Sequence, residues 1–184
     1  MATLKNQILI SMPHMKDPFF SSSVIFICEH NKDGAMGLIV NKNFKEQSLK
    51  TMFNNLFFDK NSIKSNVGNI YFGGPVMLER GIVLHSSKFS TTGTLSISED
   101  FSITSQKTVL EELKEEKTIP FKLMLGHAGW SAKQLEREIE NGDWLIQSTN
   151  PDFIFSTGLS KMWRSALKSL GIDLGINSGS GGEA

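Results

Sequence analysis

Three short segments of the chain concentrate polar side chains and glycines of the kind that bind small ligands. They span residues 29–31, 71–75 and 126–130. Glycine lets backbone N–H groups approach a ligand closely, and consecutive N–H groups can form a nest for an anion. The third segment is expected to lead into a helix N-terminus, which also favours an anion. Tight turns and close helix–sheet contacts explain such glycines equally well, and neither the GxxxxGK[ST] nor the GxGxxG signature occurs.

Histidines and the single cysteine are the other residues that could do chemistry. Zinc needs three or four converging ligands, often at i, i+2 or i, i+4, and none of the four histidines are so spaced. We therefore expect no metal and no other cofactor. A histidine can act as a base near neutral pH, so a hydrolase that uses His30 or His85 is an alternative. Cys28 lies within an apolar run, where a thiol is inert.

We place a candidate ligand site where the three segments meet. Backbone N–H groups and the Arg80 guanidinium would hold an anionic group, and Glu29 or Asn31 would orient it. A weak surface ion pair is the other explanation of Arg80. No catalytic residue is assigned. The candidate ligand-binding residues are Glu29, His30, Asn31, Asn41, Gly73, Gly74, Arg80, His85, His127 and Gly129.

Strands must position these residues, and hydrophobic periodicity predicts where they lie. Residues 23–30 are apolar on both faces, with Ile25 and Ile27 on one of them, as in a strand that is covered on both sides. A turn at 31–34 joins this strand to another at 35–41, which predicts a hairpin. Further strands are expected at residues 7–12, 69–72, 81–85, 94–98, 121–126 and 144–146.

Helices are predicted where apolar residues recur on one helical face, at residues 48–58, 104–116 and 161–170. A capping-box pair, Ser131 and Gln134, marks the start of another helix. Because the early strands cluster without helices between them, we predict an α+β fold, with a mixed, largely antiparallel sheet and helices packed on it. Residues 1–176 would form a single domain, and the Gly- and Ser-rich residues 177–184 a flexible tail.

Composition narrows the class of protein. The chain has 184 residues, of which 39% are hydrophobic and 21% charged, so it can bury a core. Nineteen basic and nineteen acidic side chains cancel, whereas nucleic-acid binders usually carry a basic excess. No apolar run approaches the roughly 20 residues of a membrane span, no secretory signal is recognisable, and one free cysteine fits a reducing compartment. We therefore expect a cytoplasmic protein without a membrane segment.

Many of these segments, taken in order, resemble the AlgH/YqgE family of bacterial proteins. The stretches that carry the resemblance are LISMP at 9–13, DPFF at 17–20, SVIFICEHN at 23–31, GAMGLIVN at 34–41, GGPV at 73–76, VLHS at 83–86, GHAGW at 126–130 and QLEREI at 134–139. The position of His127 resembles one that is usually tyrosine in the family, and the tail lacks the His-Ala ending of many members. The resemblance implies a single α/β domain in the bacterial cytosol and brings no established activity.

Our first expectation is a non-enzymatic protein that binds a small anionic ligand or a protein partner in a cleft at strand ends. The hydrolase with a histidine base is the second reading. A transcriptional regulator is the third, since the namesake of the family was linked to transcriptional control. A regulator would need a basic face, for which the candidates are Lys42, Lys45, Lys50, Lys60 and Lys64. No DNA-binding motif is present, so nucleic acid is not the expected partner, and we expect a monomer or a weak homodimer.

Overall fold

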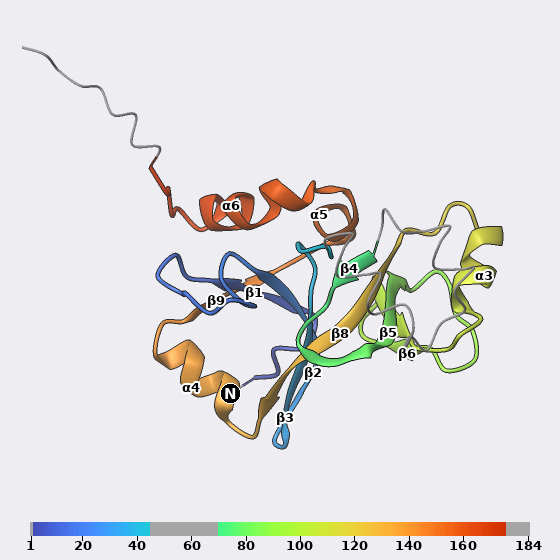
Figure 1. Cartoon of the computed structure of the whole chain (residues 1–184), viewed down its shortest axis with the longest axis horizontal. Coiled ribbons are helices and arrows are strands. Elements are labelled where there is room, and N and C mark those ends of the chain that lie inside the picture. Colours follow the sequence, from blue (N-terminus) through green and yellow to red (C-terminus); the bar gives the residue numbers. More distant parts are fainter. Residues whose placement is uncertain (1, 45–69, 176–184) are drawn as a thin grey trace, which may run out of the picture.

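The computed structural model describes residues 2–44 and 70–175, which build one curled sheet with helices packed on it (Figure 1). In chain order the strands are β1 (Gln7–Ser11), β2 (Val24–Asn31), β3 (Gly34–Ile39), β4 (Ile70–Phe72), β5 (Val76–Ser86), β6 (Leu95–Ser96), β7 (Phe101–Thr104), β8 (Phe121–Ser131) and β9 (Trp144–Ser148). Their order across the sheet is β6-β7-β5-β8-β3-β2-β1-β9, and β4 also pairs with β8. Of the described pairs only β4–β8 is parallel, so the predicted α+β fold with a largely antiparallel sheet is confirmed.

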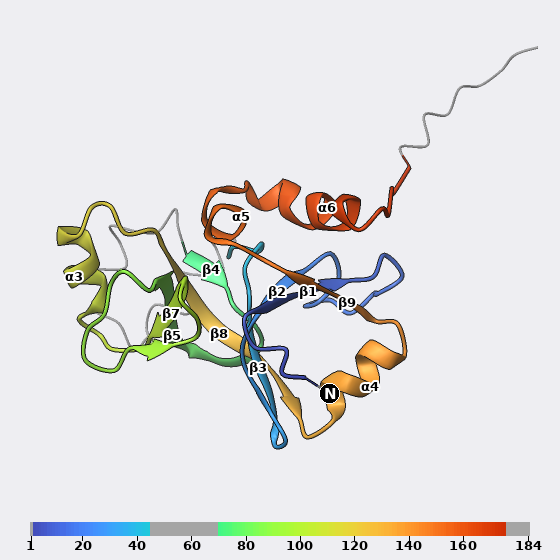
Figure 2. The same ribbon diagram turned by 180° about the vertical axis from the view of Figure 1, so that it is seen from behind.

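The described helices are α3 (Val109–Glu115), α4 (Gln134–Glu140), α5 (Pro151–Ser156) and α6 (Leu159–Ser169). Figures 1 and 2 show α5 and α6 along one side of the β1–β2–β9 end of the sheet, with α4 on the other side. In the described ranges, none of the helices has both the length and the apolar character that crossing a bilayer requires. The helix predicted at 48–58 and the tail predicted at 177–184 lie outside the described residues.

Side chains alternate along β1 and β2, which explains why this end of the sheet is covered on both faces. Ile8 of β1 packs in one core cluster with Leu167 of α6. Its neighbour Leu9 points to the other face and packs with Leu135 of α4. In β2, Ile27 lies on the α4 side, as its alternation predicts. Full burial of one such side chain stabilises the folded state by about 1.5–3 kcal/mol. Contacts of this kind hold α6 on one face of the sheet and α4 on the other.

The helix predicted at 104–116 is wrong at its start. Thr104, its first predicted residue, is the last residue of β7, and α3 begins only at Val109. Ser102 and Thr104 of β7 are polar but buried, and Thr104 Oγ1 lies 2.8 Å from His85 Nε2 of β5. Phe101 and Ile103 alternate with these polar residues, but a strand of four residues is too short for that alternation to predict it, and pairing with β5 stabilises it.

The strand predicted at 121–126 continues to Ser131, so the GHAGW segment lies inside β8 and does not open a helix. Gly126 has φ +72° and lies where the pairing of β8 with β5 is irregular. A Cβ at this position would come within 2.2 Å of the Gly74 carbonyl oxygen. The glycine therefore bends the strand at a bulge instead of ending it.

Ser131 is not the N-cap of α4, which corrects the capping-box prediction. The helix begins at Gln134 after Lys133, whose φ is +59°, and no side chain caps it. Ser131 still meets Gln134, since its backbone N–H and hydroxyl donate to Gln134 Oε1 at 3.0 and 3.1 Å. The third segment therefore does not lead directly into a helix N-terminus, as the sequence predicts, but stays in β8 up to Ser131.

Candidate functional site

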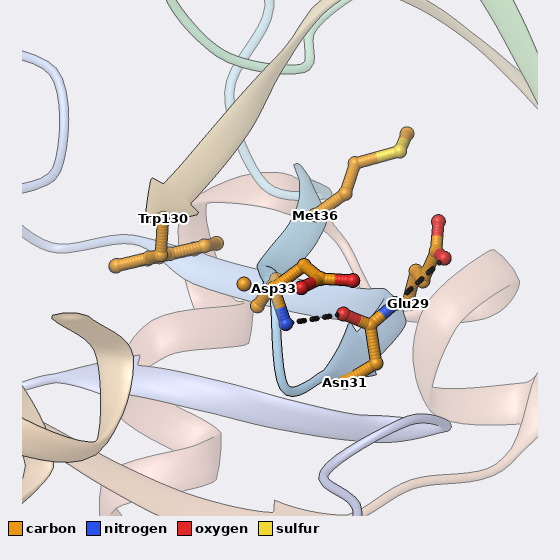
Figure 3. A pocket seen from close by; sticks show the side chains of 7 residues that line it. Glu29, Asn31, Asp33, Met36 and Trp130 are labelled. Atoms are coloured by element: carbon orange, nitrogen blue, oxygen red, sulfur yellow. Dashed lines mark hydrogen bonds between the residues drawn. The ribbon is translucent and has the colours of Figure 1, made fainter. Parts of the chain in front are cut away.

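The first predicted segment ends β2 and helps to line a shallow pocket of about 230 Å³ (Figure 3). Glu29 and Asp33 supply carboxylates to it, and Trp130 lies at one side. Asn31 stands between the two acids: its Nδ2 donates to Glu29 at 3.1 Å, and its Oδ1 accepts the Asp33 N–H at 2.8 Å. None of the described lining residues is basic. The pocket therefore repels the kind of ligand that we expected Glu29 and Asn31 to orient.

His30 is held in place by bonds at both ring nitrogens. Its Nδ1 accepts the Leu4 backbone N–H at 2.9 Å, and its Nε2 lies 2.9 Å from Glu136 Oε1. Because Nδ1 is an acceptor, Nε2 carries the proton and donates to Glu136. This hydrogen bond holds the pKa of the Glu136 carboxyl below its ordinary value. The imidazole offers no free nitrogen to a hydrolytic reaction.

His85 is fully buried between β5 and β7. Its Nδ1 donates to the Ser86 carbonyl oxygen at 2.9 Å, and Thr104 Oγ1 lies 2.8 Å from its Nε2. Thr94 Oγ1 in turn lies 2.8 Å from Thr104 Oγ1. Burial lowers the pKa of His85, while the bond to Ser86 opposes this. His85 thus links strands in the core, and neither histidine suggested for the hydrolase reading has a free ring nitrogen.

Cys28 is buried in β2, where its Sγ lies 3.8 Å from the Phe26 carbonyl oxygen. Burial raises the pKa of this thiol far above its usual range. A thiol in that environment is neither a nucleophile nor a metal ligand. Its position agrees with the apolar run in which the sequence places it.

The second segment and the start of the third pack against each other through their backbones. The Gly73 N–H donates to the Leu125 carbonyl at 2.9 Å, and the Gly73 carbonyl accepts the Ile39 N–H at 2.8 Å. A Cβ on Gly74, whose φ is +152°, would lie 2.1 Å from the carbonyl carbon of His127. These glycines are needed for close approach of two chain segments, and the Gly73 amide is not free to bind an anion.

His127 and Arg80 come together beside this contact. Burial lowers the pKa of the His127 imidazole, and the positive charge of Arg80 lowers it further. The Nδ1 atom of His127 is buried and has no hydrogen-bond partner in the described part of the chain. Both effects favour the uncharged form of the imidazole.

The three segments do not form one site. Trp130 of the third segment borders the pocket of Glu29 and Asn31, whereas His127 packs against Gly74. The third segment therefore contacts each of the other two at a different point along β8. Within the described residues, no group of three or more His, Cys, Asp or Glu side chains could hold a metal ion.

A different pocket, of about 310 Å³, gathers positive charge at the ends of β2 and β3. Lys42 follows β3, and Arg164 comes from α6. Asn41 fixes the strand ends: its Oδ1 accepts the Val24 N–H at 2.8 Å, and its Nδ2 donates to the Ser22 carbonyl at 2.9 Å. None of the described lining residues is acidic. Of the predicted candidates, this pocket contains Asn41.

The start of α6 adds positive potential to the same pocket. Leu159 and Ser160 line it, and α6 runs for 11 residues from there. The first N–H groups of a helix have no acceptor within it, and no side chain caps them here. They and the helix dipole favour an anion at this end. Trp163, whose indole N–H donates to the Ser11 carbonyl at 2.8 Å, anchors α6 in this position.

Lys42 is held at the edge of the pocket. Its Nζ donates to the Phe19 carbonyl oxygen at 2.6 Å. Burial lowers the pKa of Lys42, and the nearby Asp17 carboxylate opposes this shift. The other lysines suggested for a DNA-binding face lie outside the described residues, so the regulator reading stays an untested prediction.

Sequence reasoning misses most of this basic pocket. Arg164 and Trp163 lie on the predicted helix at 161–170. The pattern of that helix predicts that its apolar face packs in the core and that its arginine is exposed to solvent. Ser160 precedes that predicted helix by one residue. These residues reach Lys42 only because α6 folds back over the sheet. No local spacing in the sequence could have linked them.

Comparison with known proteins finds relatives in several bacteria. The chain matches the family described as DUF179, AlgH-like, over residues 8–175. A UPF0301 protein of Pseudoalteromonas translucida is 40% identical over 189 residues, covering 100% of both chains. A UPF0301 protein of Proteus mirabilis is 37% identical, covering 98% of this chain and 99% of that protein.

Two solved structures resemble the fold along most of its length. The solution structure of the AlgH protein from Pseudomonas aeruginosa matches with a TM-score of 0.74 and 31% identity, covering 100% of this chain and 99% of that chain. A crystal structure of a Corynebacterium diphtheriae protein matches with a TM-score of 0.70 and 20% identity, covering 92% of this chain and 88% of that one. The second of these likenesses concerns the fold alone.

Proposed function

This chain belongs to the AlgH-like family, as its motifs predict, and we propose that it binds a small anionic ligand in the pocket between the β2–β3 strand ends and α6. One observation carries the proposal. Two cationic side chains, Lys42 and Arg164, and an uncapped helix N-terminus face a cavity of about 310 Å³ whose described lining contains no carboxylate. The cleft lies at strand ends, where the sequence led us to expect a ligand.

Each group has a distinct part in binding. Arg164 is exposed, and its guanidinium can bind a carboxylate or phosphate through two parallel N–H bonds. Lys42 is half-buried, so its charge is less screened by solvent than that of a surface lysine. The Ser160 hydroxyl and the first N–H groups of α6 supply further donors.

The volume limits the size of the ligand. The cavity lies at the lower end of the roughly 300–1,000 Å³ that small-molecule pockets occupy. It suits a small metabolite that carries a phosphate or carboxylate group, with the Trp163 ring as an apolar neighbour. Asn41 acts by holding the strand ends, since both ends of its amide are engaged by backbone groups.

A thermal-shift panel tests the proposal. Inorganic phosphate, pyrophosphate and citrate are each added at matched ionic strength, with sodium chloride as the reference. A ligand at 100 times its dissociation constant stabilises the folded state by about 2.7 kcal/mol, which for a chain of this size raises the midpoint by roughly 5–10 °C. We expect such a shift with at least one anion and its loss in Arg164→Gln.

Lys161→Gln is the matched control, because Lys161 lies in the same turn of α6 but does not line the pocket. It should keep the wild-type shift. Equal shifts in the two variants would mean that the anions act on the whole molecule and not in this pocket. No shift with any anion would reject the proposal.

A further inference from the structure

A second cavity, on the α4 side of the sheet, has the opposite character. It measures about 380 Å³ and lies between α4, the end of β8, the start of β9 and the loop before β2. Its walls hold three aromatic rings, those of Phe20, Trp130 and Trp144. It shares none of its described lining residues with the basic pocket.

The aromatic rings are arranged at right angles rather than in a flat stack. Trp130 and Trp144 have centroids 6.2 Å apart and planes at 80°. Phe20 meets Trp144 in the same way, at 6.0 Å and 76°. Trp130 and Trp144 are largely buried, so only part of each ring borders the cavity. These ring surfaces give the cavity an apolar wall on which an alkyl chain can pack.

One carboxylate fixes both indoles. The indole N–H groups of Trp130 and Trp144 each donate to Glu138 Oε2 at 2.9 Å. The Gln134 amide donates to the other oxygen, Oε1, also at 2.9 Å. The rings are therefore positioned before any ligand arrives, which reduces the entropy cost of binding.

Two more carboxylates border the cavity and keep free acceptor capacity. Asp17 uses Oδ1 to accept the N–H groups of Phe19 and Phe20, at 2.8 and 3.0 Å, and its Oδ2 accepts from no described residue. Asp143 Oδ1 lies 3.7 Å from His14 Nε2, and its Oδ2 likewise accepts from none. No lysine or arginine is among the described lining residues, and Lys42, which interacts electrostatically with Asp17, lies outside them. The cavity thus offers anionic acceptors beside aromatic faces.

We propose that this cavity binds a small organic cation with primary ammonium groups, such as an aliphatic amine, through the Trp130–Trp144–Phe20 walls and the Asp17 and Asp143 carboxylates. The aromatic walls take the alkyl part and the carboxylates take the ammonium. The described carboxylates do not gather into a group that could hold one metal ion, and the cavity is far larger than a bare ion needs. A small organic cation, unlike a bare ion, can contact both a carboxylate and the aromatic walls.

Calorimetric titration of the full-length protein with 1,4-diaminobutane tests the proposal. The uncharged 1,4-butanediol matches its length, and Mg²⁺ tests whether charge alone is sufficient. We expect saturable binding of the diamine, none of the diol, and Mg²⁺ binding weaker by about tenfold or more, because a hydrated ion has no alkyl chain to pack on the aromatic walls. The same binding of diol and diamine, or of Mg²⁺ and diamine, would overturn the proposal.

Asp17→Asn with Asp143→Asn is the matching variant, because asparagine keeps the shape and the Oδ1 acceptor. We expect the diamine affinity to fall by about tenfold or more, as bonds to charged groups are lost. Asp100→Asn removes an exposed carboxylate outside this cavity and should leave the affinity unchanged. If the double variant proves unfolded by circular dichroism, Asp143→Asn alone replaces it, since this side chain accepts no backbone bond. Wild-type affinity in a folded variant, or no heat with the diamine, would contradict the proposal.

Discussion

Lys122 is a lysine in the core of the sheet. Its side chain is only 4% exposed. The Nζ atom donates to the Val40 carbonyl oxygen at 3.0 Å and lies 4.7 Å from the ring centroid of Tyr71. Burial lowers the pKa of this ammonium to about 8. A carbonyl and an aromatic face thus replace water around it, with no carboxylate counter-ion in the described residues, so its charge opposes folding.

The pH dependence of stability should reveal this buried charge. The folded-state pKa of Lys122 lies below its ordinary value of 10.5, so the unfolded chain binds more protons between the two and stability rises with pH there. Lys122→Met removes the charge but keeps the length. The free energy of unfolding should rise by about 2 kcal/mol more in the wild type than in the variant between roughly pH 7.5 and 9.5. Denaturant unfolding at both pH values measures this difference.

Lys117→Met is the control, because Lys117 is exposed. It should follow the wild type across the same pH range. Parallel curves for the wild type and Lys122→Met would show that Lys122 keeps an ordinary pKa.

The sequence identifies residues that could do chemistry, but not the residues to which they hydrogen-bond. His30 stands out as a titratable group at a strand end, but its partner Glu136 lies 106 residues away. His85 likewise depends on Thr104, from a strand of four residues that is too short for its alternation to predict it. Chemistry depends on whether a ring nitrogen is free, and only tertiary contacts decide that.

Among the elements, α4 has a role that exceeds its length of 7 residues. Through Glu138 it joins Trp130 of β8 to Trp144 of β9, two strands that do not pair with each other in the described sheet. Leu135 of the same helix packs in the core cluster that contains both tryptophans. One carboxylate therefore fixes the orientation of two strands and a helix.

Glu138→Gln should destabilise the protein markedly. The substitution keeps the shape but removes the charge that both indole N–H groups bond to. Because hydrogen bonds to a charged group are worth about 1.5–3 kcal/mol each, we expect a loss of about 2 kcal/mol or more in the free energy of unfolding. The near-ultraviolet circular dichroism of the tryptophans should change with it.

Glu140→Gln serves for comparison, since Glu140 is an exposed carboxylate on the same helix. It should change stability by less than about 0.5 kcal/mol, as surface substitutions usually do. Equal effects of the two variants would contradict the role given to Glu138.

Strands with strong apolar patterns could be predicted, and elements stabilised by their neighbours could not. β2 is apolar on both faces, and its position follows from the sequence within a residue or two. Gly126 by itself predicts the end of a strand. β8 continues through it because β8 pairs with β5 on both sides of the irregularity. α5 begins at Pro151 with Asn150 as its N-cap, so its signal is a cap and not a hydrophobic face.

At the scale of the whole molecule, the fold separates charges that cancel in the composition. Nineteen basic and nineteen acidic side chains give no net charge. Even so, the α6 side of the sheet carries a basic pocket and the α4 side an acidic, aromatic one. The loop before β2 reaches both, since Asp17 lines the acidic cavity and Ser22 the basic one. Net charge could not have predicted either pocket.

The proposed anion pocket lies at strand ends, where the sequence predicts a ligand site, but most of its residues could not be predicted. The glycine-rich segments predict an anion nest, whereas Gly73 and Gly74 allow close packing of the backbone. Lys42 and Arg164 line one pocket only because α6 lies over the sheet, and no local spacing in the sequence indicates that arrangement. Of the candidate ligand-binding residues predicted from the sequence, Asn41 is the one that lines the basic pocket.

An amide NMR titration of the ¹⁵N-labelled protein with pyrophosphate tests the central claim most directly. The three tryptophans give separate indole N–H reporters, because Trp163 bonds to Ser11 beside the basic pocket while Trp130 and Trp144 bond to Glu138 on the other side of the sheet. We expect the largest shifts at the Trp163 indole and at the amides of Ser160 and Lys42, with the other two indoles unmoved. Shifts that centre on Trp130 and Trp144, or none at saturating pyrophosphate, would contradict the anion pocket.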